Sequence, residues 1–188
     1  DEEHRLDEDE LIAMAFLLLV AGYITTVNLI GSGIAALLAH PDQLQMLRDD
    51  PELLPGAIEE FLRYDGPVNP GIARFAREDV VIAGVPIPRG ATVLVASAIA
   101  DRDPAQFPDP DRLDITRQDN AHLAFGHGIH YCLGAPLARL EGQIAVETVL
   151  RRLPHLSLAV PPGELRWRPG ALRGPEQLPV TFTSDASG

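Results

Sequence analysis

The amino-acid sequence predicts a mainly α-helical protein with small antiparallel β-sheets. An uncharged stretch from Leu11 to Leu38 and an Ala- and Leu-rich segment from about Leu133 to Leu153 indicate two long helices. Between them lie short runs of β-branched residues separated by Gly and Pro turns, which indicate strands. With 188 residues, of which 46% are hydrophobic and 22% charged, the chain has the composition of an ordinary globular protein with a sizeable core.

The first helix is expected to begin near Asp7 and to end near His40. The residues of Asp7–Glu10 are all acidic and would lie in the first turn, where the helix dipole favours negative charge, and Pro41 closes the segment. Because this helix is apolar on all sides, protein must enclose it all round, and no other segment is large enough to do so alone. We therefore expect the chain to be part of a larger fold, from which an N-terminal portion is missing.

The same helix raises the alternative of a membrane span, since about 20 predominantly apolar residues are enough to cross a bilayer. Only Leu11 to Ala21 is strongly apolar, and the rest contains glycines, threonines, an asparagine and a serine behind an acidic flank. We interpret the segment as a helix buried inside protein and expect no membrane contact.

The elements after this helix follow from the turn signals that separate them. They are expected to be helices from Pro41 to about Asp49 and from Pro55 to Tyr64, strands Ile72–Phe75, Val80–Ile82 and Thr92–Ala96 in a small antiparallel sheet, an ordered loop over 101–120, and short strands ending at 179–182.

Charge and cysteine content exclude several classes of protein. The formal net charge of −12 argues against nucleic acid as a partner, because binding to a phosphate backbone needs clustered basic residues. The single cysteine excludes an internal disulfide, and the N-terminus has no features of a signal peptide. We therefore expect a cytoplasmic protein.

The single cysteine, Cys132, lies in a glycine-rich loop just before the second long helix. The N–H groups and dipole of a helix start stabilise a thiolate, and Gly128 and Gly134 let the backbone approach a flat ligand. Thiolate ligation of haem iron suits oxygen activation. Two alternatives remain open from the loop alone: a buried core cysteine, and a zinc site with His127 and His130.

The pattern Phe125-x-x-Gly128-x-His130-x-Cys132-x-Gly134 resembles the haem-binding signature of the cytochrome P-450 family. The resemblance implies that residues 1–188 are the single C-terminal, haem-binding portion of the cytochrome P-450 fold. It also implies haem b as cofactor, with Cys132 as the iron ligand and dioxygen as co-substrate. Phe125 and Gly126 would lie beside the haem.

Further motifs occur in the order found in this family. Glu60 and Arg63 match its Glu-x-x-Arg motif, and Pro110-Asp111-Arg112-Leu113 matches its meander motif, with Leu113 where an aromatic residue is usual. The resemblance implies that Glu60, Arg63 and Arg112 form a structural charge network that holds the cysteine loop. It also implies that Arg74 and His130 bind the haem propionates.

The first long helix resembles the oxygen-binding groove of the family. Ala21 matches a small residue of that groove, and Thr25 matches the catalytic threonine. Members of the family usually carry an acid immediately before this threonine, whereas this chain has Ile24. We expect protons to come instead from ordered water or from a polar group of the substrate. The residues that would line the substrate pocket are Val20, Ile24, Ile72 and Leu172.

The resemblance therefore implies a haem-thiolate monooxygenase that inserts one oxygen atom into a small apolar or natural-product-like substrate in secondary metabolism. Electrons would come from a ferredoxin and a ferredoxin reductase, with Arg139, Arg151 and Arg152 as docking contacts, although a solvated basic face is an alternative for each. The alternative function is a catalytically weakened homologue that acts as an auxiliary binding partner of another biosynthetic enzyme. Ile24 is its only support.

Overall fold

The computed structural model describes residues 5–69 and 71–183. Its α-helices and β-strands, in chain order, are α1 (Glu8–Ala39), α2 (Pro41–Asp49), α3 (Leu54–Asp65), β1 (Ile72–Phe75), β2 (Val80–Ile82), β3 (Val85–Ile87), β4 (Thr92–Val95), α4 (Ser97–Ala100), α5 (Ala135–Arg152), β5 (Ser157–Leu158) and β6 (Val180–Thr181). Three short 3-10 helices are η2 (Pro51–Leu53), η3 (Gly128–His130) and η4 (Pro162–Glu164). The structure confirms a mainly helical fold with small antiparallel sheets.

A side-chain cap fixes the start of α1. The Asp7 side chain accepts a hydrogen bond from the Glu10 N–H at 2.8 Å, and the Glu10 side chain accepts one from the Asp7 N–H at 3.0 Å. At the other end, His40 is the last capping residue and Pro41 begins α2. Both ends of the helix are therefore as the sequence predicted.

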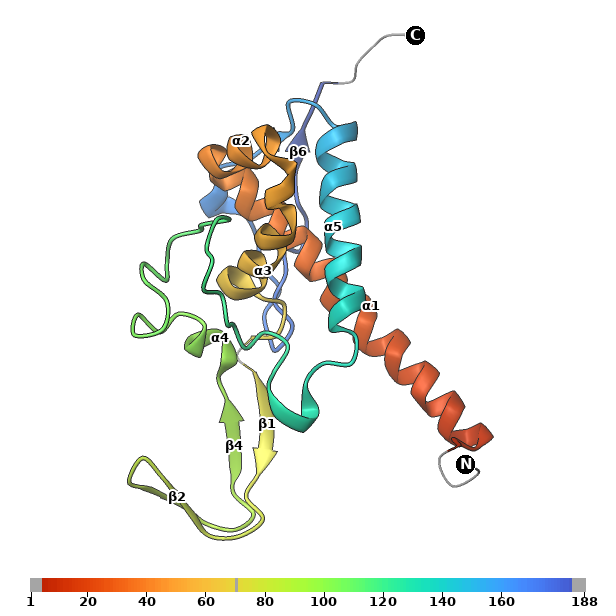
Figure 1. Cartoon of the computed structure of the whole chain (residues 1–188), viewed down its shortest axis with the longest axis vertical. Helices are drawn as coiled ribbons and strands as arrows, with labels where there is room; N and C mark the ends of the chain where they lie inside the picture. Colours follow the sequence, from red (N-terminus) through yellow and green to blue (C-terminus); the bar gives the residue numbers. More distant parts are fainter. Residues whose placement is uncertain (1–4, 70, 184–188) are drawn as a thin grey trace.

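The core lies where the C-terminal half of α1 packs against α3 and α5 (Figure 1). Gly33 permits the close approach of α1 to α3, because a Cβ at this position would lie 2.5 Å from Cδ2 of the buried Phe61. The fully buried aliphatic residues of α3 and α5 include Ile58, Leu62 and Val146. Burial of these side chains in one core packs α3 against α5.

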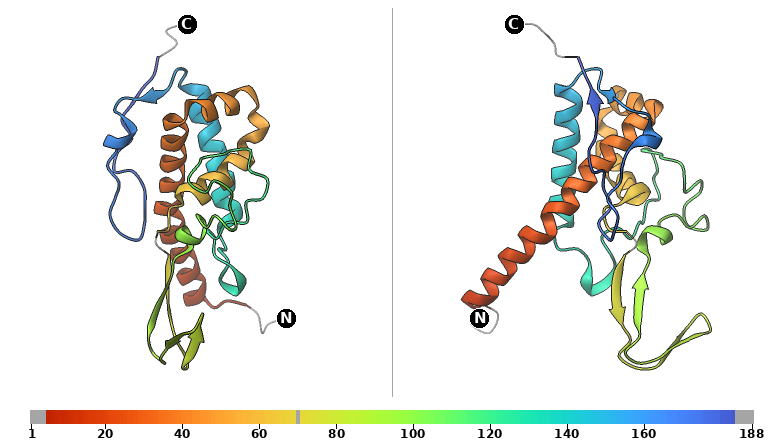
Figure 2. Two further views of the ribbon diagram at one scale, coloured as in Figure 1. Left: turned by 90° about the vertical axis from the view of Figure 1, so that its left-hand side faces the viewer. Right: turned by 180° about the vertical axis from the view of Figure 1, so that it is seen from behind.

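The N-terminal half of α1 extends beyond this core (Figures 1 and 2) and is exposed. By length and composition α1 could cross a membrane, and none of its most apolar segment is buried within the chain. The expectation of a buried helix is therefore not met by the described residues. No other described segment lies over this half of α1, so its apolar side chains stay exposed.

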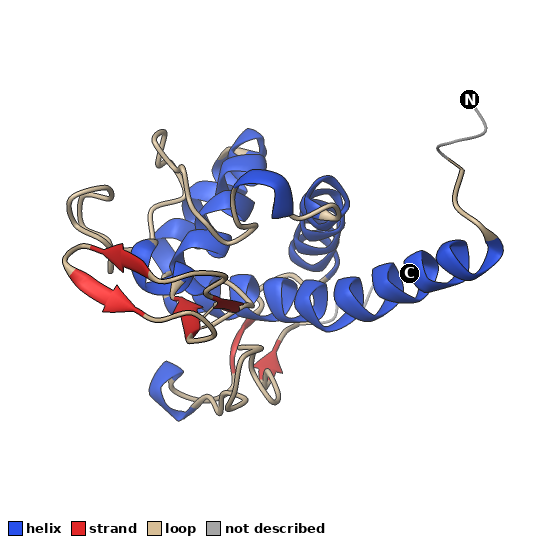
Figure 3. Ribbon diagram, turned by 90° about the horizontal axis from the view of Figure 1, so that it is seen from below, coloured by secondary structure: helices blue, strands red, loops and turns tan. Residues whose placement is uncertain are grey.

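The strands form three separate two-stranded antiparallel pairs, β1 with β4, β2 with β3 and β5 with β6. Ile72 pairs with Val95 and Phe75 with Thr92. The strand β3 was not expected from the sequence. It pairs with β2 because Ala83 and Gly84, both with positive φ, form the tight turn between the two strands. In the view of Figure 3 these strands lie to one side of the helical core, away from the projecting end of α1.

Candidate functional site

The loop that carries Cys132 is closed by its own backbone. The Cys132 N–H donates to the Phe125 carbonyl at 2.9 Å, and the Cys132 carbonyl accepts from the Ala135 N–H at 3.2 Å. Gly126 and Gly128 both have φ of +74°, in the left-handed region that favours glycine. The cysteine thus lies immediately before α5, as predicted, in a loop whose shape depends on its glycines.

Exposed apolar residues lie close to Cys132 in the sequence, and Cys132 is itself half-buried. Ile129 is 97% exposed, Leu133 72% and Leu137 58%. Figure 1 shows the loop at the same end of the molecule as β1, β4 and the N-terminal half of α1. Apolar residues exposed together in this way mark a surface that binds a ligand or another part of a fold.

These features fit a haem bound through its iron to the cysteine. The donor is a single half-buried thiol in a segment that exposes apolar residues, and a Cβ at Gly128 would meet nothing within 4 Å, so the loop leaves room for a flat apolar group. The zinc alternative gains no support, since no group of three His, Cys, Asp or Glu side chains in the described part of the chain could hold a metal ion. The core-cysteine alternative does not agree with the partial exposure of Cys132.

The α1 residues expected near the haem run from the projecting N-terminal half of the helix, with Val20 and Ala21, to just past its middle, with Ile24 and Thr25. The Thr25 hydroxyl donates to the Ala21 carbonyl at 2.7 Å, which leaves its oxygen free to accept. Val20 is 56% exposed and Ile24 is 37% exposed. The residue immediately before Thr25 is therefore the apolar Ile24 and not an acid.

The two residues expected to bind propionates are both exposed. Arg74 lies on β1 opposite Val93, and its guanidinium donates to the neighbouring Ala73 carbonyl at 3.1 Å. His130 ends the short helix η3 in the cysteine loop. Both side chains are accessible to a carboxylate.

The two remaining pocket residues belong to segments that lie side by side. Leu172 lies opposite Val68 in an isolated antiparallel bridge. Val68 precedes Ile72, the first residue of β1, by four residues. Ile72 and Leu172 are 54% and 39% exposed. The C-terminal segment is therefore placed beside the start of β1, where both side chains can contact a ligand.

Glu60 and Arg63 form a fully buried ion pair on α3. Arg63 Nε and Nη2 donate to Glu60 Oε2 and Oε1, each at 2.8 Å, and both side chains are 0% exposed. Arg63 also donates to the carbonyls of Asp101, Pro110 and Arg112 at 2.7 to 3.1 Å. The pair thus ties α3 to the loop over 101–112.

The expected role of Arg112 requires correction. Its side chain is exposed, and it contributes only its backbone carbonyl to this network. Arg117 takes the expected place, with Nε 3.3 Å from Glu60 Oε2 and a side chain that is 9% exposed. The reason is the path of the loop, which buries Leu113 and Ile115 and so turns Arg112 outward.

A second ion pair was not predicted as a functional feature. Glu59, next to Glu60, accepts two hydrogen bonds from Arg139 of α5 at 2.7 and 2.8 Å and contacts His122 at 3.1 Å. Burial raises the pKa of Glu59, but the bonds from Arg139 and His122 outweigh it, and the pKa falls to about 2. Its sequence signal was the pair of adjacent acids at 59 and 60, of which only the second matched a motif.

The basic residues expected to dock an electron donor do not share one surface. Arg139 is bound to Glu59 near the cysteine loop. Arg151 and Arg152 lie in the last turn of α5, roughly 24 Å along the helix from its start at a rise of about 1.5 Å per residue. These two arginines are therefore at the opposite end of the helix from Cys132.

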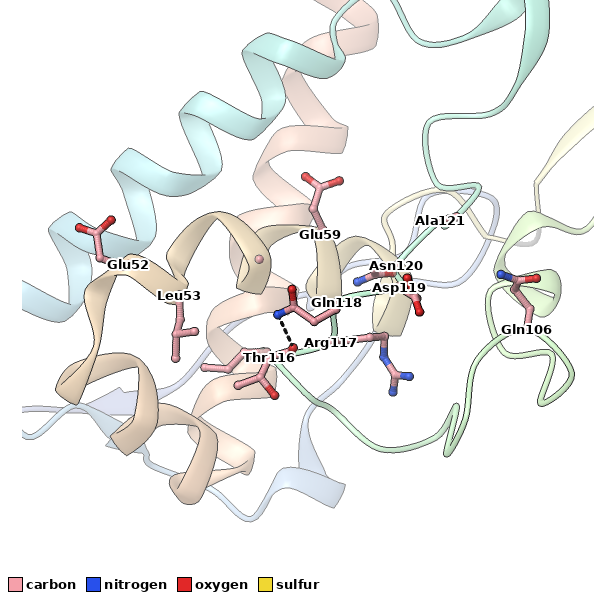
Figure 4. Close-up of a pocket in the computed structure, with 12 residues that line it drawn as sticks. Glu52, Leu53, Glu59, Gln106, Thr116, Arg117, Gln118, Asp119, Asn120 and Ala121 are labelled. Carbon is pink, nitrogen blue, oxygen red and sulfur yellow. Dashed lines mark hydrogen bonds between the residues drawn. The ribbon is translucent and has the colours of Figure 1, made fainter.

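A polar surface pocket of about 790 Å³ lies between α3 and residues 115–121 (Figure 4). Gln118 donates to the Thr116 carbonyl at its rim, at 3.1 Å. Among the described residues, none of those expected to hold a haem lines it. We assign no function to this pocket.

The family model described as cytochrome P450 matches residues 1–181. The chain belongs to the cytochrome P450 family. It is 58% identical over 181 residues to cytochrome P450 107B1 of Saccharopolyspora erythraea, covering 96% of this chain and 45% of that protein. It is 56% identical over 183 residues to cytochrome P450 monooxygenase PikC of Streptomyces venezuelae, covering 97% of this chain and 44% of that one.

Solved cytochrome P450 structures share the fold. The ligand-free monooxygenase TamI matches with a TM-score of 0.92 and 50% identity over 96% of this chain and 44% of its own. P450BioI, solved with a fatty acid ligated to acyl carrier protein, matches with a TM-score of 0.89 and 49% identity over 95% of this chain and 46% of its own. The chain thus spans about half the length of its relatives. Haem b and dioxygen are the cofactor and co-substrate of the family.

Proposed function

We propose that the protein is a haem-thiolate monooxygenase of the cytochrome P450 family. The observation that carries the proposal is the half-buried Cys132 in a glycine-shaped loop before α5, with exposed apolar residues on either side of it in the sequence. Bound haem with a thiolate ligand supplies oxygen activation, because the thiolate pushes electron density that favours O–O cleavage. One oxygen atom would enter the substrate and the other would leave as water, with two electrons and two protons.

The residues of this chain would divide the remaining work. Cys132 would hold the iron, and Arg74 and His130 would pair with the propionates through charge-assisted hydrogen bonds. The Thr25 hydroxyl already donates to the Ala21 carbonyl, so it can accept a bond from water or from a polar group of the substrate. Ile24 offers no ionisable group, and the proton source would therefore be such a water or the substrate itself.

The substrate would be an apolar natural product bound near Val20, Ile24, Ile72 and Leu172. Relatives at 48% to 56% identity support this class: PikC, the 6-deoxyerythronolide B hydroxylase of S. erythraea and the mycinamicin IV hydroxylase/epoxidase of Micromonospora griseorubida. The exposed apolar character of the four lining residues agrees with it. The electron donors would be a ferredoxin and its reductase, and the location the cytoplasm.

The exposed half of α1 would be covered by the rest of the same fold. The relatives are about twice as long as this chain, and the match to P450BioI covers 95% of it, so most of the 32 residues of α1 are matched within that fold. Enclosing an apolar helix in protein removes its surface from water and stabilises the fold by about 25 cal/mol per Å². This assignment favours an internal helix over a membrane span.

Ile24 supports one alternative function, an auxiliary binding partner that has lost efficient turnover. The two functions differ in the state of the cysteine. The full-length protein is purified with haem bound, reduced with dithionite and exposed to carbon monoxide. The proposal predicts the Soret band position diagnostic of thiolate ligation, and Cys132→Ser should abolish it while Ser97→Ala leaves it unchanged. A band at the position of a non-thiolate haem in the wild type would overturn the proposal.

A further inference from the structure

We propose that Glu59, Arg139 and Tyr131 are positioning residues that bracket the cysteine loop and set the placement of Cys132 Sγ. We call these three side chains the loop bracket. The inference rests on the proposed function in one respect, that the ligand of Cys132 Sγ is a haem iron. The contacts themselves are between residues of this chain.

One guanidinium connects α3 to both ends of the loop. Arg139 Nε and Nη2 donate to Glu59 Oε1 and Oε2 at 2.7 and 2.8 Å, the two-pronged geometry that suits a carboxylate. Its Nη1 donates to the Tyr131 hydroxyl at 3.2 Å. The face of the same group lies 4.7 Å from the Phe125 ring centroid. Phe125 opens the loop and Tyr131 directly precedes Cys132, so both ends rest on one side chain.

Aromatic packing reinforces the arrangement. The rings of Phe125 and Tyr131 meet edge to face with centroids 6.3 Å apart. The backbone closes the same span, because the Cys132 N–H donates to the Phe125 carbonyl at 2.9 Å. A displacement of Tyr131 would therefore move the backbone that carries the sulfur.

His122 extends the contacts of Glu59 to the segment that enters the loop. Its Nδ1 accepts from the Ala124 N–H at 3.2 Å, which assigns the proton to Nε2, and Nε2 lies 3.1 Å from Glu59 Oε2. The side chain of His122 is 3% exposed. Glu59 thus contacts the segment before the loop through His122, and the loop itself through Arg139.

The ion pair is also electrostatically secure. The pKa of Glu59 falls to about 2 in spite of its burial, and the hydrogen bonds that Arg139 donates to Glu59 and Tyr131 raise the pKa of Arg139. Both groups stay charged across the working range of an enzyme. The loop bracket therefore acts as a constant constraint.

The same geometry argues against Arg139 as a docking contact for an electron donor. Three of the five N–H groups of its guanidinium donate to Glu59 and Tyr131. The side chain is 31% exposed, and one face is covered by Phe125. Replacing Arg139 should therefore change the position of Cys132 Sγ more than it changes the binding of an electron donor.

The test uses the haem-loaded, full-length protein and its variants Arg139→Gln, Arg139→Lys, Glu59→Gln and Tyr131→Phe. The control is Arg48→Gln, at an exposed position in the last turn of α2. Two readouts are the share of the reduced carbonyl complex at the thiolate band position and the rate of haem transfer to an excess of apomyoglobin.

We expect Arg139→Gln and Glu59→Gln to lower the thiolate share and to speed haem loss about tenfold, the usual scale for residues that orient a metal ligand. Arg139→Lys should recover part of the effect, since an ammonium can pair with Glu59 but cannot also reach Tyr131 with the same fork. Tyr131→Phe, which removes one hydrogen bond, should have the smallest effect. Arg48→Gln should match the wild type.

Unchanged band shares and unchanged haem loss in all four variants would overturn the inference. So would slower reduction by a ferredoxin with an unaltered carbonyl spectrum, because Arg139 would then be a docking contact. If the wild type shows no thiolate band, the proposed function fails instead. Hydrogen exchange of the cofactor-free protein then decides the loop bracket: Glu59→Gln must speed exchange at the Cys132 amide, and an unchanged rate refutes it.

Discussion

Replacing Glu60 by Gln is the sharpest test of how α3 is tied to the loop over 101–120. The carboxylate is 0% exposed and accepts from Arg63 Nε and Nη2 at 2.8 Å, from the Asp114 N–H at 2.9 Å and from Asn120 Nδ2 at 3.1 Å. Arg117 Nε lies 3.3 Å away. Glutamine keeps the shape but replaces one acceptor oxygen with an amide that faces donors, and it leaves the buried Arg63 without its counter-charge.

The expected cost follows from that uncompensated charge. Breaking a buried pair by removing one partner costs about 3–5 kcal/mol, out of a total stability of roughly 5–15 kcal/mol for a domain. With a urea m-value of about 2 kcal/mol/M, the unfolding midpoint should fall by roughly 2 M.

Urea unfolding of the cofactor-free protein, followed by circular dichroism at neutral pH, measures this shift. The matched control is Glu147→Gln on the exposed surface of α5, which should change stability by no more than about 0.5 kcal/mol. A loss below about 1 kcal/mol for Glu60→Gln would refute the reasoning, since the pair would then behave like a surface contact.

Three further predictions concern the acid limb of stability, the α1–α3 contact and the proton supply. The folded pKa of Glu59 is about 2 against an ordinary 4.5, so its stabilising effect is present above about pH 4.5 and lost as the pH falls toward 2; Glu59→Gln should flatten that limb in melting scans across acid pH. Gly33→Ala should lower stability by about 1–3 kcal/mol through its clash with Phe61, whereas Gly22→Ala, whose Cβ meets nothing within 4 Å, should not lower it; equal melting temperatures would contradict this. In the haem-loaded protein, Ile24→Glu should raise product formed per electron and lower peroxide release, and an unchanged ratio would count against the water- or substrate-supplied proton route.

The sequence by itself was enough to determine the longer helices and most of the strands, though not β3, and to place the cysteine just before α5. Asp7 and Pro41 mark the ends of α1 because caps and prolines act on hydrogen bonds only a few residues away. The glycine at 126 and the cysteine at 132 could likewise be placed in a loop before α5, since backbone φ preferences are local.

Only the tertiary structure decided which charges meet. Arg117, and not Arg112, reaches Glu60 because the path of the loop depends on which of its apolar residues enter the core. Glu59 and Arg139 are 80 residues apart, and they pair because α3 and α5 pack against the same half of α1. Such contacts depend on the packing of distant elements, which no local pattern encodes. For the same reason the composition of α1 could predict a buried helix but not which segments would cover its N-terminal half, and the described residues place none there.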